Sequence, residues 1–221
     1  MRELLFASCP TMLWVISVIE LVFTVLLFFH YAKSRNLIFL LSGLICVGLT
    51  YDALVLALGS FLTEGAALAA LSRMRYVLHG GLIPLIFAIC AYALNFKGFW
   101  KTAAWVLTGV LIVLGVADGC IRVIGPTTVA GICRYASVSA PAWAEIVNSL
   151  LTFGTVIPMM AAGVAVWIKQ KTPHLFLSAF LMFAFSGLGA ACLDLMFYIS
   201  MYGEVLMALF FYLYCMKKEK M

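Results

Sequence analysis

Charged residues are scarce in this sequence, and that scarcity excludes a soluble fold. Asp, Glu, Lys and Arg make up 10% of the 221 residues, whereas 66% of the residues are hydrophobic. The mean hydropathy is +1.14. A chain this apolar lacks the polar residues to cover a soluble core, so it needs lipid as its solvent. We therefore expect one integral membrane domain, residues 1–221, that is embedded in the lipid bilayer.

Long polar stretches are also rare, and the apolar runs between them approach the roughly 20 residues of a membrane-spanning helix. The runs predict an all-α, polytopic bundle of seven transmembrane helices over residues 11–32, 37–59, 76–96, 102–124, 143–168, 174–199 and 204–216. The last run is the shortest, which leaves an alternative of six spans plus a short last helix. Residues 60–75 are expected to form a short interfacial helix. Residues 125–142, rich in Gly, Ser, Thr and Pro, are expected to form a loop.

Lysine is absent from these seven runs. The eight lysines follow the first, third, fifth and last runs, at Lys33, Lys97, Lys101, Lys169, Lys171, Lys217, Lys218 and Lys220. Cytoplasmic loops carry this excess of basic residues, so the pattern predicts an external N-terminus and a cytoplasmic C-terminus in the cell (plasma) membrane. The net charge of +5 then reflects orientation and contact with anionic headgroups. It does not indicate binding to nucleic acid.

The few charges inside the apolar runs gather toward the predicted outer side. A charge at the bilayer centre costs about 2.5–3.5 kcal/mol, so such residues are expected to face a partner or a water-filled cavity. We expect an outward-facing pocket that binds or transports a small polar or charged molecule or a lipid headgroup. Its candidate residues are Asp52, Arg75, His79, Asp118, Arg122 and Asp194. The alternative is a structural network in which Asp118 pairs with Arg122 at i,i+4, and Arg75 pairs with Asp52 or Asp194.

His79 and Glu20 suggest that the protein moves protons. His79 has a side chain suited to carrying protons near neutral pH, and Gly80 and Gly81 are expected to leave room beside it. Glu20 is isolated in the middle of the first run, where it is either a proton carrier or a protonated hydrogen-bond donor. Whether the protein is an enzyme stays open. An intramembrane enzyme acting on a lipid would use His79 as general base, and a sensor or assembly subunit would instead bind another membrane protein.

Histidine and cysteine are too few and too scattered to predict a metal site. His30 and His174 lie at the predicted cytoplasmic ends of their runs, whereas His79 lies toward the predicted outer side. No cysteine spacing is typical of zinc or iron–sulfur ligation. Three cysteines map to the predicted outer side, where a disulfide that includes Cys133 stays open. They are Cys9, Cys120 and Cys133.

The seven-span outline resembles that of microbial rhodopsins. Local similarities are Arg75-Tyr76 and Pro84-Leu85 in the third run and Ala117-Asp118-Gly119 in the fourth. Retinal attachment in that family uses a lysine in the seventh span, and residues 204–216 contain none. We therefore expect neither retinal nor any other cofactor.

Close helix packing is expected where small residues recur. Gly115 and Gly119 form a GxxxG pattern in the fourth run, and a second group surrounds Gly187 in the sixth.

Overall fold

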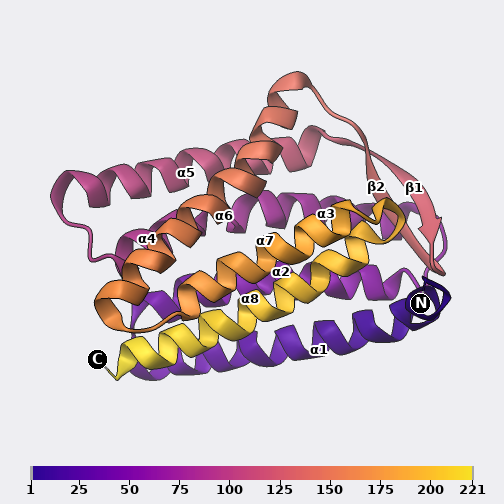
Figure 1. Cartoon of the computed structure of the whole chain (residues 1–221). Coiled ribbons are helices and arrows are strands. Elements are labelled where there is room, and N and C mark those ends of the chain that lie inside the picture. Colours follow the sequence, from indigo (N-terminus) through magenta and orange to yellow (C-terminus); the bar gives the residue numbers. More distant parts are fainter. Residues whose placement is uncertain (1, 221) are drawn as a thin grey trace.

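The computed structural model describes residues 2–220, apart from the side chains of residues 2–5 and 193. The chain forms a bundle of long helices with one β-hairpin at one end (Figure 1). The helices are α1 (Arg2–Ser34), α2 (Leu37–Leu58), α3 (Ala66–Leu82), α4 (Leu85–Ala93), α5 (Gly98–Ile121), α6 (Ala142–Gln170), α7 (His174–Ala190) and α8 (Met196–Glu219). The strands are β1 (Val123–Val129) and β2 (Ile132–Ser139), and a 3-10 helix, η1 (Leu193–Leu195), precedes α8.

Within the described residues, six helices are long and apolar enough to cross a membrane, counting α3 and α4 as one crossing over Ala66–Ala93. These helices mark the chain as a multi-pass integral membrane protein. The seventh, α7, has 17 residues and is the short one. The prediction of a short last helix was wrong, because α8 begins at Met196 and has 24 residues. The apolar sequence continues through the turn before α8, so hydropathy alone placed that boundary too late.

The third crossing also starts earlier than predicted. Helix α3 begins at Ala66, so residues 66–75 belong to the crossing and do not form a separate interfacial helix. Arg73 and Arg75 made this part of the run look polar. The crossing is interrupted at Pro84, which has no backbone donor.

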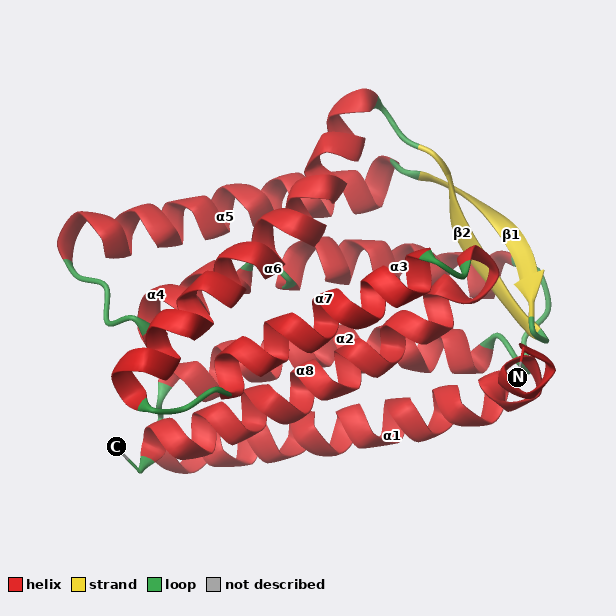
Figure 2. Ribbon diagram, viewed as in Figure 1, coloured by secondary structure: helices red, strands yellow, loops and turns green. Residues whose placement is uncertain are grey.

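The predicted loop at 125–142 is mostly a β-hairpin (Figure 2). Strands β1 and β2 pair antiparallel, and Ala130 and Gly131 form the two-residue turn, both with positive φ. This is the backbone that a tight hairpin turn requires. The hairpin is attached to the end of α2, because the Cys133 amide donates a hydrogen bond of 2.8 Å to the Gly59 carbonyl.

The hairpin defines one end of the bundle, which we call the hairpin end. The opposite end holds the last turns of α1, α6 and α8 and the link between α4 and α5 (Figure 1). These segments, the first turn of α5 and the residues directly after α6 and α8 carry the eight lysines, so we call it the lysine end. The lysines therefore share one end of the molecule, as their spacing predicts.

Glycines bring α3 and α5 into backbone contact. A Cβ atom on Gly80 would overlap the backbone of Gly115, and one on Gly119 would overlap the backbone of Tyr76 and Val77. The close packing expected of Gly115 and Gly119 is confirmed. The role expected of Gly80 was wrong, since this residue makes room for α5 and not for the His79 side chain.

Candidate functional site

A buried ion pair joins the second and third crossings. Asp52, in the last two turns of α2, is 8% exposed and accepts a hydrogen bond from the Arg75 Nε atom of α3. At 1.5 Å per residue, Asp52 lies about 9 Å from the end of α2 and Arg75 lies about 14 Å from the start of α3. The pairing of Asp52 with Arg75, which the sequence left as one of two alternatives for Arg75, is formed.

Two more carboxyl groups lie close to this pair. Glu20 of α1 is fully buried, and Glu204 of α8 is 3% exposed. In the described part of the chain, neither Glu20 oxygen has a hydrogen-bond partner, and nor does Glu204 Oε2. Asp52 interacts electrostatically with both glutamates, and Arg75 interacts with Glu204. We call Glu20, Asp52, Arg75 and Glu204 the carboxyl cluster.

Glu204 was not predicted to belong to this cluster. The seventh apolar run begins at 204, and that boundary puts the Glu204 carboxylate at the membrane surface, where it contacts solvent. The helix actually starts eight residues earlier, at Met196, so Glu204 lies about 12 Å along α8. The signal that was available is the distance to the lysines at the helix ends, since Glu20 lies about 21 Å from the end of α1 and Glu204 about 22 Å from the end of α8.

Arg134 adds a cation from the hairpin side. Its guanidinium lies 4.4 Å from the centre of the Phe197 ring. Burial, together with the positive charge of Arg75, lowers the pKa of Arg134 below its ordinary value. Asp52 acts in the opposite direction, which shows that β2 brings Arg134 within electrostatic range of the carboxyl cluster. Arg134 was not among the predicted site residues, because residues 125–142 are typical of a loop in their composition.

His79 connects the carboxyl cluster to a cavity. It lies four residues after Arg75 on α3, and it interacts electrostatically with Asp52 and Arg75. It also lines a cavity of about 370 Å³. The other lining side chains come from all crossings except α1 and α5 and are mainly apolar, with some hydroxyls, and include Leu49, Ile86, Leu151, Thr155, Met182, Ser186, Phe197 and Ser200.

The predicted site residues and the lining of this cavity overlap at one position. Of the six candidate residues, all of them described, His79 lines the cavity and the other five do not. Asp52 and Arg75 contact each other beside it. Asp194 is exposed in η1, at the connection between α7 and α8 and not within a span as expected.

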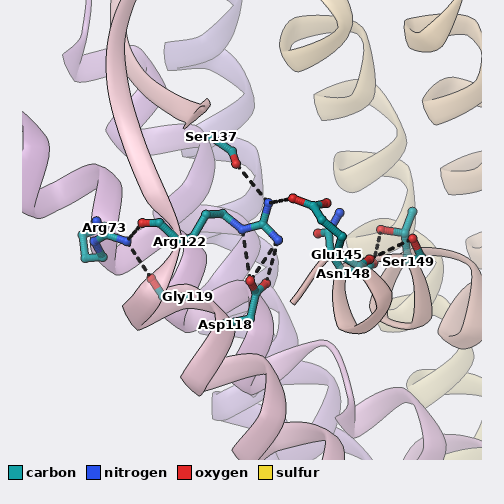
Figure 3. A network of polar contacts seen from close by, with 9 residues as sticks. Arg73, Asp118, Gly119, Arg122, Ser137, Glu145, Asn148 and Ser149 are labelled. Carbon is teal, nitrogen blue, oxygen red and sulfur yellow. Dashed lines mark hydrogen bonds and ion pairs between the residues drawn. The ribbon is translucent and has the colours of Figure 1, made fainter. Parts of the chain in front are cut away.

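Asp118 and Arg122 belong to a separate set of contacts (Figure 3). Arg122 Nη2 lies 2.9 Å from Asp118 Oδ1, and Arg122 Nη1 donates to Ser137 Oγ at 3.0 Å and to Glu145 Oε1 at 3.3 Å. Arg73 donates to the carbonyl oxygens of Gly119 and Arg122. We call these residues the Arg122 network.

The side chain of Arg122 is fully hydrogen-bonded within its network. The predicted i,i+4 pair of Asp118 and Arg122 is formed, and Arg122 is 4% exposed with its Nε, Nη1 and Nη2 atoms all donating. The contacts join α5 to β2, α6 and α3. This arrangement fixes the hairpin on the helix ends, and it leaves no Arg122 nitrogen to receive a ligand.

The structure does not gather metal ligands. Across residues 2–220, no group of three or more His, Cys, Asp and Glu side chains with described positions is placed to hold a metal ion. All seven cysteines are free thiols, and Cys9 and Cys133 are buried ones.

The sequence matches no protein family and no curated protein.

Proposed function

We propose that this membrane protein binds or transports a small molecule and couples that step to a proton held by the carboxyl cluster. The molecule occupies the cavity beside His79. One observation carries the proposal: both carboxyl oxygens of Glu20 and the Oε2 atom of Glu204, from the first and last helices, are buried and have no hydrogen-bond partner among the described residues. Both glutamates nevertheless interact electrostatically with Asp52, which is paired with Arg75.

Charge balance supports a bound proton. If all three carboxyls were ionised, Arg75 and Arg134 together would compensate two negative charges and leave the third in an apolar interior. Burying an uncompensated ion costs several kcal/mol. A proton on Glu20 or Glu204 removes that cost. Cys46 and Asp52 of α2 interact electrostatically with Glu20, and Asp52 and Arg75 interact with Glu204, while the two glutamates interact with each other. His79 of α3 and Arg134 of β2 act on Asp52 and Arg75.

The place of His79 supports coupling. It lines the cavity and interacts electrostatically with Asp52 and Arg75. A ligand that contacts the His79 ring therefore changes the electrostatic environment of the carboxyl cluster. Ionisable residues inside a membrane commonly mark proton relays for this reason. In this proposal the Asp52–Arg75 ion pair forms the polar end of the binding site. Asp118 and Arg122 instead attach the hairpin to the helix ends.

Infrared difference spectroscopy of the protein in lipid vesicles, between acidic and alkaline pH, tests the proton site. We expect a band from a protonated, buried carboxyl group that is lost in Glu204→Gln or Glu20→Gln. Glutamine keeps the size of the side chain and cannot exchange the proton. Glu64→Gln, at an exposed position between α2 and α3, is the matched control and should leave the band unchanged. A spectrum without any titrating buried carboxyl would contradict the proposal.

An intramembrane enzyme is the second candidate, because the same cavity holds the His79 imidazole and the hydroxyls of Ser186 and Ser200. The Ser200 hydroxyl is engaged with the Phe197 carbonyl at 3.3 Å. Incubation of the purified protein with membrane lipids would separate the two functions. Product that disappears in His79→Ala would favour the enzyme.

A further inference from the structure

Helices α6 and α7 touch at the lysine end and separate toward the hairpin end (Figure 1). At the lysine end, a Cβ atom on Gly163 would overlap the backbone of Phe176. Farther along α7, a Cβ atom on Gly187 would meet no described atom within 4 Å. Gly187 therefore does not produce the close packing that the sequence predicts, whereas the neighbouring Gly189 does, because a Cβ atom on it would lie 3.1 Å from the carbonyl oxygen of Met196 in α8. Gly187 instead forms part of the cavity wall with Ser186 and Ala190.

The rim of the cavity lies on the outside of the bundle. Phe153 of α6 is 55% exposed and Phe183 of α7 is 41% exposed, and both line the cavity with the exposed Gly187. Phe153 lies about 16 Å from the start of α6, and Gly187 about 20 Å from the start of α7. In a hydrocarbon layer about 30 Å thick, these depths face lipid tails and not water.

The chemistry of the lining restricts the occupant. Apolar side chains dominate the wall, and the polar lining groups are uncharged hydroxyls together with the His79 ring. The nearby carboxyl cluster disfavours an anionic ligand. A zwitterionic headgroup is costly to bring to this depth. The volume of about 370 Å³ lies in the range of about 300–1,000 Å³ typical of small-molecule pockets.

We propose that the cavity takes an uncharged, single-chain, lipid-soluble molecule directly from the bilayer through the gap between α6 and α7. Its apolar body lies against α6 and α7, and its one hydrogen-bonding group reaches His79. The inference rests on the proposed function and names the ligand class for the same site.

Photolabelling in phosphatidylcholine vesicles tests this route. The probe is a long-chain alcohol that carries a diazirine, present as a trace component, and labelled peptides are mapped by mass spectrometry. We expect labels concentrated on the cavity-lining segments of α6 and α7. Gly187→Leu fills the cavity and should lower this labelling roughly tenfold, which corresponds to about 1.4 kcal/mol of binding free energy.

Gly109→Leu is the matched control. Gly109 lies on exposed α5, and a Cβ atom there would also meet no described atom within 4 Å. This variant should keep the labelling of the native protein. If Gly187→Leu fails to fold, as judged by thermal unfolding, Ala190→Leu places the same side chain on another part of the wall.

Three outcomes would overturn the inference. Labels could be spread evenly over the exposed faces of α1 and α5, or Gly187→Leu and Ala190→Leu could leave cavity labelling unchanged. A diazirine-bearing phosphatidylcholine could also label the cavity as strongly as the alcohol does, which would show ordinary bilayer chains in it. Labelling does not depend on the infrared band of the carboxyl cluster, so either proposal can fail without the other.

Discussion

Arg75 is the cation on which the carboxyl cluster depends. It bonds directly to Asp52, and its charge also acts on Glu204. Its Nη1 atom is buried without a hydrogen-bond partner in the described part of the chain. Such an atom increases the cost of losing Asp52, because the guanidinium would then keep its charge with fewer contacts.

A double-mutant cycle on this pair measures that dependence. Asp52→Leu should lower the free energy of unfolding by about 3–5 kcal/mol, because it removes the hydrogen-bonded carboxylate partner of the buried Arg75 charge. Arg75→Leu should lower the free energy of unfolding by a similar amount, because it leaves the buried Asp52 carboxylate without its cation. The double variant should be more stable than either single variant, as measured by unfolding in mixed detergent micelles. Additive losses would show that the two side chains are not coupled.

The residues inside the helices show how far the sequence could predict the site. The spacing of Asp118 and Arg122 is local, and a local rule was enough to predict their contact. Glu204 and Asp52 are brought together by packing between α8 and α2, and that contact depends on where α8 begins. Because the boundary was placed at 204 instead of Met196, the partner of Glu20 and Asp52 appeared to be an interfacial residue.

At the scale of elements, the hairpin is the feature that hydropathy did not predict. Val123, Ile124, Thr127, Thr128 and Val129 have β-branched side chains that favour a strand, yet the Gly, Pro and Ser around them favoured a loop. The deciding contacts are tertiary. The hairpin is fixed at one side by Gly59 and at the other by Arg122 and Ser137.

Gly59→Ala tests how the hairpin is attached. Gly59 has φ of −62°, so alanine fits the backbone, but its Cβ atom would overlap the carbonyl oxygen of Cys133. We expect amide hydrogen exchange in β1 and β2 to increase about tenfold, which corresponds to about 1.4 kcal/mol of lost local stability. Gly65→Ala is the control, because a Cβ atom there would meet no described atom within 4 Å. Unchanged exchange at Cys133 would show that this contact does not hold the hairpin.

At the scale of the whole molecule, the two ends carry different chemistry. The lysine end has short connections and the eight lysines, whereas the hairpin end has Arg73, Arg122 and Arg134 bonded or buried within the fold. Lysines in short loops set orientation during insertion, whereas arginines that are engaged inside the protein serve its structure. The sequence could separate these two groups of basic residues because lysine avoids the apolar runs. It could not assign the arginines to partners, since those contacts arise only when α3, α5 and the hairpin pack together.

This division predicts that the lysine end faces the cytoplasm and the hairpin end faces outward. Single cysteines at Thr128 in β1 and at Lys97 before α5 test it, in a background that carries Cys120→Ser and Cys192→Ser because those two native thiols are exposed. A membrane-impermeant maleimide added to intact cells should label Thr128→Cys and should label Lys97→Cys only after permeabilisation. The reverse pattern would place the carboxyl cluster in the cytoplasmic half of the membrane. A proton would then reach Glu20 and Glu204 from the cytoplasm, so the same experiment sets the side from which the proposed coupling draws its protons.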